Sequence, residues 1–117
     1  KIVVMCFANG IQSCSKLVER LNARLHGLPK ALGIRVVAAT DTGFLRASMT
    51  LEEHTHMAAN GFAHGGSIVA LADTAAGYGT FAALPAGASS FTTLALSANF
   101  ISSAPAGAAL SCDATCA

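Results

Sequence analysis

Apolar residues at helical spacing predict an amphipathic helix near the start of the chain. The apolar stripe follows Ser15 and consists of Leu17, Val18, Leu21 and Leu25. Charged residues fill the opposite face, as expected of a helix with one side in water. Ser15 is suited to cap this helix, and Gly27 with Pro29 is suited to end it.

Segments with a two-residue period predict strands. Residues 34–40 are rich in β-branched side chains, and residues 44–51 alternate between apolar and polar. The turn signal Asp41-Thr42-Gly43 lies between them, which predicts a hairpin. The same criteria predict three further strands, at residues 2–8, 91–101 and 108–116. The second of these three has an apolar face made of Leu94, Leu96, Ala98 and Phe100.

The longest apolar run in the chain is NGFAHGGSIVALADTAAGYGTFAAL, residues 60–84. It is too long for a strand and is dominated by Ala and Leu, so we predict a helix. Because apolar side chains lie on every side of it, we expect this helix to be buried at the centre of the molecule. Together with the strands, it predicts an α+β fold with one antiparallel sheet around one helix, in a single domain over residues 1–117.

Composition and charge narrow the possible partners. The net charge of +1 provides no field for attracting nucleic acid. All seven Lys and Arg lie at or before Arg46, which leaves the second half of the chain strongly apolar. The apolar surface of that half must be covered by the rest of the protein, by another subunit or by lipid. A membrane span at residues 66–84 is disfavoured, because Asp73 lies at its centre and no Lys or Arg flanks it.

Asp73 and the sequence His64-Gly65-Gly66 are the two chemistry-bearing features of the apolar run. A carboxylate among apolar residues has to be hydrogen-bonded, by backbone amides or Thr74 for example, or placed at a cavity. The glycines lie where the helix should begin, and there the unpaired N–H groups can stabilise a developing oxyanion. The alternative is a glycine-rich entry to a tightly packed helix, with His64 as a capping residue.

The spacing of these two features favours a site shared between subunits. Asp73 lies nine residues after His64, which is two full turns, or about 11 Å along a helix axis, plus a further half turn that puts the two residues out of phase. Within one chain the two side chains therefore point apart. If they cooperate, the economical arrangement places them opposite one another across a twofold axis.

The remaining candidates are weaker. His54, His56, Glu52 and Glu53 could form a metal cluster with His64, but an exposed polar loop explains them better, and we expect no metal or cofactor. The four cysteines lack paired spacing, so we expect free thiols in a reducing compartment, which favours a cytoplasmic protein. Cys112 and Cys116 lie four apart on a predicted strand, where they should be buried small hydrophobes.

The segments HTHMAANGFAHGGSIVALADTAAGYG and LPAGASSFTTLALSANFISSAPAG closely resemble the hotdog-fold thioesterases of the phenylacetate-pathway and 4-hydroxybenzoyl-CoA thioesterase type. The resemblance extends from about Leu25 to the end of the chain. It implies a curved antiparallel sheet wrapped around a long buried helix, and a dimer or dimer of dimers. It also implies hydrolysis of an acyl-CoA substrate at the subunit interface.

The resemblance also implies roles for particular residues. Asp73 matches the acid that activates water or attacks the thioester, and the Gly65 amide matches the group that polarises the carbonyl. His64 would help to place the thioester, and Thr93 would help to hold the attacking water. The predicted substrate-binding positions are Asn60, Gly66, Gly77 and Arg46. Separately, small residues such as Ala76, Gly77 and Gly79 leave room for an aryl or medium acyl group.

The chain departs from the family pattern at two points. The family often has an Asn six residues before the motif His, where this chain has Ala58, so Asn60 is the nearest substitute. The family also has two more strands after the position of Cys116, and residues 2–8 could fill one of those positions. Two other functions stay open: a non-hydrolytic module that binds acyl-CoA or acyl carrier protein, or dehydrates its substrate, and a structural oligomer with a degenerate site.

Overall fold

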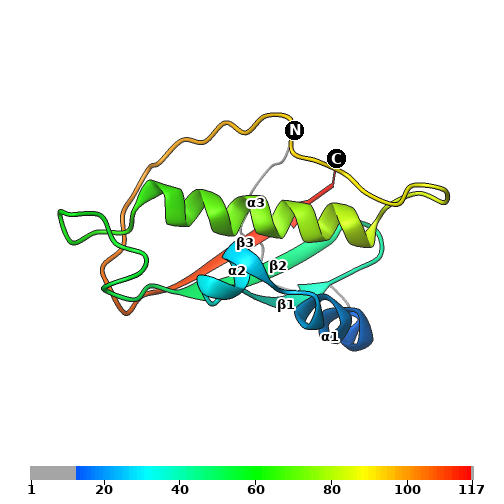
Figure 1. Cartoon of the computed structure of the whole chain (residues 1–117), viewed down its shortest axis with the longest axis horizontal. Coiled ribbons are helices and arrows are strands. Elements are labelled where there is room, and N and C mark those ends of the chain that lie inside the picture. The colour runs from blue at the N-terminus through cyan, green and yellow to red at the C-terminus, as the bar shows by residue number, and fades with distance from the viewer. Residues whose placement is uncertain (1–12, 117) are drawn as a thin grey trace.

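The fold combines three helices with a three-stranded sheet, described by a computed structural model for residues 13–116 (Figure 1). The elements in chain order are α1 (Ser15–Ala23), α2 (Gly27–Ala31), β1 (Arg35–Ala39), β2 (Phe44–Thr50), α3 (Gly65–Ala82) and β3 (Ala109–Thr115). The long helix α3 lies along one face of the sheet, and α1 packs against β1. The strand predicted at residues 2–8 lies outside the described residues.

The sheet is antiparallel, with the order β1-β2-β3. The predicted hairpin is confirmed, and Gly43 adopts the φ of 97° that its turn requires. The predicted final strand is confirmed as β3, which pairs with β2 in a register that places Asp113 opposite Arg46. Cys112 is buried as predicted, whereas Cys116 lies beyond the end of β3 and is exposed, contrary to the prediction.

The core lies between α3 and the sheet. Alternate residues of β2 point into it, and one stripe of α3 meets them, made of Ser67, Leu71, Ala75 and Gly79. The predicted long helix is therefore confirmed, but the prediction that it is buried on every side is wrong. Three strands cover only one side of a helix, so most other residues of α3 are half-buried.

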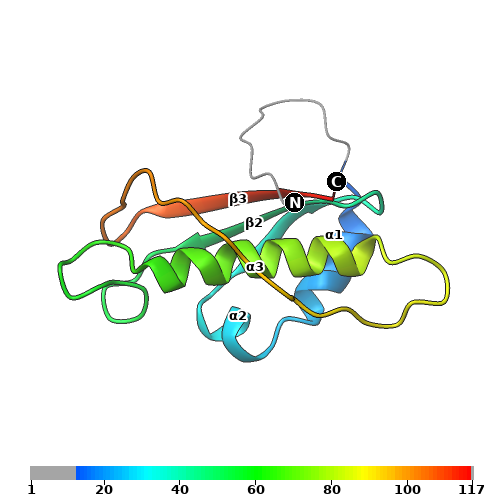
Figure 2. The ribbon, with the colours of Figure 1, turned by 90° about the horizontal axis from the view of Figure 1, so that it is seen from above.

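Residues 91–101 form no strand, which contradicts the alternation in their sequence. They run back along a side of α3 that the sheet does not cover (Figure 2). Within the described chain their backbone groups form no hydrogen bond with other backbone groups, because neither edge of the sheet lies beside them (Figure 2). The rings of Phe91 and Phe100 contact α3, while Leu94 is 93% exposed and its predicted apolar face has no core to join.

The first helices differ in detail from the prediction. Ser15 is the first residue of α1 and not its cap. Cys14 takes the N-cap position, without a side-chain hydrogen bond. The helix ends at Ala23, and Gly27 and Pro29 belong to the short helix α2 instead of ending α1. Proline is tolerated there because the amides of a first helical turn have no partner inside the helix.

Candidate functional site

The start of α3 is capped by His64. This residue has the extended φ and ψ of −68° and 133°, and its Nδ1 accepts a 2.8 Å hydrogen bond from the Gly66 amide. A Cβ atom on Gly66 would lie 2.9 Å from that nitrogen, so the close approach of the imidazole requires glycine. Because Nδ1 accepts, the ring proton of a neutral His64 is on Nε2, which remains a potential donor.

The Gly65 amide is the free donor of this helix start. Gly65 is the first residue of α3, a position whose N–H has no partner inside the helix. Among residues 13–116, no backbone or side-chain acceptor pairs with it. The helix dipole adds favourable potential for negative charge at the same place. The amide can therefore stabilise an oxyanion.

Asp73 lies half-buried in the middle of α3, and a residue from the segment 91–101 holds its side chain. The hydroxyl of Thr93 donates a 2.9 Å hydrogen bond to Oδ1 of Asp73. Thr93, and not the neighbouring Thr74, is thus the partner of this carboxylate. Since only Oδ1 takes this bond, Oδ2 remains available to accept a proton or to bind water.

The capped helix start and the Asp73–Thr93 pair occupy the same helix but do not meet within one copy of the chain. Gly65 and Asp73 are eight residues apart, which corresponds to about 12 Å along a helix axis. A thioester carbonyl is far smaller than that distance. The two groups of one chain therefore cannot act on the same carbonyl.

The other residues predicted to bind substrate lie in a loop, on α3 and in the sheet. Oδ1 of Asn60 accepts from the Phe62 amide within an exposed turn. Gly77 lies under Phe91, whose Cζ would be 3.1 Å from a Cβ at that position. Arg46 is in the strand β2, on the face away from α3, and forms a bidentate ion pair with Asp113 at 2.6 Å. That pair gives the guanidinium a structural role.

His56 is the residue whose place the sequence pattern did not predict. Its side chain is buried, with 2% exposure, whereas an exposed polar loop was expected. Its ring and its carbonyl oxygen join three parts of the backbone, and no spacing rule in the sequence indicates this. Within residues 13–116 no three His, Cys, Asp or Glu residues are grouped to hold a metal ion.

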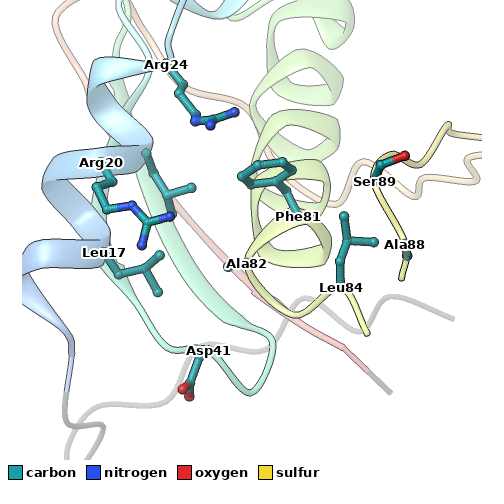
Figure 3. Close-up of a pocket in the computed structure, with 10 residues that line it drawn as sticks. Leu17, Arg20, Arg24, Asp41, Phe81, Ala82, Leu84, Ala88 and Ser89 are labelled. Atoms are coloured by element: carbon teal, nitrogen blue, oxygen red, sulfur yellow. The ribbon is translucent and has the colours of Figure 1, made fainter. Parts of the chain in front are cut away.

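A separate hollow of about 390 Å³ lies between α1 and the far end of α3 (Figure 3). Its walls combine apolar side chains with charged and polar ones, and the guanidinium of Arg24 lies over the ring of Phe81 at 4.9 Å from the centroid. None of the predicted site residues lines it. No helix in the described part of the chain is long and apolar enough to cross a membrane.

Comparison with known proteins supports one family. Residues 60–117, which include both groups on α3, match the model of the thioesterase superfamily. This match supports membership of the hotdog-fold thioesterase family. It is similar to a solved structure, the E. coli PaaI protein from the phenylacetic acid degradation operon. The two share 27% identity with a TM-score of 0.70, over 85% of this chain and 72% of that chain. No curated protein matches the chain.

Membership of the family supports thioester hydrolysis as the general reaction of the chain. It also accounts for the arrangement of a long helix on an antiparallel sheet, as the resemblance predicted. The free amide at the start of α3 and the carboxylate at its middle are both suited to this chemistry.

Proposed function

We propose that this chain hydrolyses an acyl-CoA thioester to a free acid and CoA, at sites formed between two copies of the chain. The class of reaction rests on the family. The observation that carries the mechanism is the hydrogen bond that Thr93 donates to Asp73, on the same helix whose first amide is free. The helix α3 thus carries both a fixed carboxylate and an oxyanion donor, and the proposed reaction requires no cofactor.

In the proposed reaction, Oδ2 of Asp73 takes a proton from a water molecule as that water attacks the thioester carbonyl carbon. Thr93 fixes the carboxylate through Oδ1, so that the second oxygen is aimed at the water. In the alternative first step, the carboxylate itself attacks the thioester carbonyl carbon. This attack would give an acyl anhydride that water then cleaves. General base catalysis of this kind contributes about 10² to 10⁴ in rate.

The carbonyl oxygen becomes negative during the attack, and the Gly65 amide stabilises it. His64 helps to place the thioester, with its Nε2–H as the available donor. The tetrahedral intermediate then collapses, the C–S bond breaks, and the leaving CoA thiolate takes the proton that Asp73 accepted from the water. The products are the free acid and CoA-SH.

Two copies are needed because Asp73 and Gly65 of one chain are too far apart to act together. A twofold axis places the carboxylate of one copy opposite the amide of the other and gives two equal sites. Within this proposal, binding of substrate by Asn60, Gly66 and Gly77 and a cytoplasmic location stay predictions. Binding of substrate by Arg46 also stays a prediction, with its guanidinium paired with Asp113 in this structure.

The test is release of free thiol from a panel of aryl and medium-chain acyl-CoA substrates, comparing the native chain with Asp73→Asn. Asn keeps the size of the side chain and its bond with Thr93 but cannot take a proton. We expect kcat to fall by about 10² to 10⁴.

Asp41→Asn is the matched control, because Asp41 is an exposed aspartate in the hairpin turn and its change should leave kcat intact. Equal activity of Asp73→Asn and the native chain would remove Asp73 from the mechanism. Binding of acyl-CoA without any thiol release would instead indicate the non-hydrolytic alternative.

A further inference from the structure

The ring of His56 is held at both nitrogen atoms by the backbone. Nδ1 accepts a 2.9 Å hydrogen bond from the Glu52 amide, and Nε2 lies 2.8 Å from the carbonyl oxygen of Leu32. A backbone amide can only donate, and a carbonyl oxygen can only accept. The two contacts therefore require a neutral ring with its proton on Nε2.

The carbonyl oxygen of His56 holds the start of α3. It accepts a 2.9 Å bond from the His64 amide and a second 2.9 Å bond from the hydroxyl of Ser67. Ser67 is buried in the first turn of α3, and His64 is the N-cap. The two residues on either side of the glycine pair are thus tied to one oxygen atom.

We propose that His56 is a positioning residue for the reaction, which fixes the direction of the Gly65 amide without touching the substrate. This inference rests on the proposed function. The ring locks the His56 peptide against Glu52 and Leu32, and the carbonyl of that peptide locks the helix start. Gly65 has no side chain to anchor it, so its orientation depends on these neighbours.

The consequence for the reaction follows from the geometry of an oxyanion donor. A displacement of about 1 Å can cost about 10² in rate, even when its cause lies outside the reacting groups. The Gly65 amide stabilises charge that develops only in the transition state. Loosening the helix start should therefore lower kcat and leave KM nearly unchanged.

The experiment compares His56→Asn and Ser67→Ala with the control His54→Asn. His54 lies in the same loop but is exposed. Hydrogen exchange is measured by NMR at the Gly66 and Ile68 amides, which are hydrogen-bonded at the helix start, with Ala75 as the reference within α3. Thiol release gives kcat and KM for the same variants.

We expect exchange at Gly66 and Ile68 to quicken by about tenfold in both test variants, with Ala75 unchanged. The value of kcat should fall by about 10 to 10² while KM stays within about twofold. His54→Asn should match the native chain in every readout. If His56→Asn fails to fold, Ser67→Ala decides, because it removes a single hydroxyl group.

Native exchange and native kcat in folded test variants would overturn the proposal. A uniform rise in exchange that includes Ala75 would also overturn it, because it would indicate a general structural role. Absence of thiol release from the native chain would refute the proposed function instead. In that case the exchange pattern would still show whether His56 fixes the helix start.

Discussion

At the scale of single residues, the sequence His64-Gly65-Gly66 has a separate physical reason for each position. His64 caps the helix, Gly66 makes room for the imidazole, and Gly65 presents the free amide. In the proposed reaction, the amide of Gly65 is the group that stabilises the oxyanion. Its role can therefore be tested without disturbing the other two residues.

Gly65→Pro should lower kcat by about 10² to 10³, because proline removes the N–H that stabilises the oxyanion. Proline is well tolerated at the first position of a helix, and His64 already has the extended conformation that must precede it. Gly65→Ala is the control. Both substitutions bring a Cβ close to the ring of Phe100, but alanine keeps the amide. Equal kcat values for the two variants in a thiol-release assay would contradict the role of this amide.

At the scale of elements, local pattern predicted α3, the hairpin and β3, because each follows from periodicity and turn chemistry within its own segment. The same kind of pattern wrongly predicted a strand at residues 91–101. A strand also requires a partner strand, and the local sequence does not show whether one lies beside it. The burial of His56 was missed for a related reason. Its hydrogen bonds join Leu32, Glu52 and α3, which are distant in sequence.

The same distinction applies to the candidate site. The glycine pair and Asp73 could be recognised because both interrupt an apolar helix. The hydrogen bond from Thr93 to Asp73 spans 20 residues and was not predicted. The resemblance to a family indicated Thr93 only as a residue that helps to hold the attacking water. The partner of Arg46 is 67 residues away in sequence, and pairing of β2 with β3 brings the two together.

The attachment of α1 to the sheet should depend on Asn22. Its side chain donates to the Val36 carbonyl and accepts from the Val36 amide, both at 2.9 Å. The side-chain amide therefore pairs with β1 through the same two backbone groups that a neighbouring strand would use. Asn22→Ala should lower the free energy of unfolding in urea by about 1 to 3 kcal/mol. Asn99→Ala, at an exposed position, should change it little. Equal unfolding midpoints for the two variants would contradict this account.

At the scale of the whole molecule, one copy of the chain presents apolar side chains to solvent along residues 91–101. Leu94 and Ile101 are 93% and 96% exposed. Large apolar patches on soluble proteins usually mark an interaction surface. A second copy is the partner that the proposed mechanism requires, because it would bring the missing half of each site.

The native chain should therefore sediment as a dimer or a larger even assembly, and Leu94→Lys should shift it toward the monomer. Leu28→Lys is the control, because Leu28 is also exposed, at 61%, but lies on α2. Analytical ultracentrifugation distinguishes the species. A native chain that is monomeric at assay concentration would refute a site shared between copies.

The most direct test of the account is complementation between two inactive variants. Asp73→Asn and Gly65→Pro chains are mixed under conditions that exchange subunits, and thiol release is measured. Hybrid dimers would contain one site with both native residues, and random exchange should restore roughly a quarter of the native activity. If the mixture stays as inactive as the separate variants although hybrids form, Asp73 and Gly65 of different copies do not share a site.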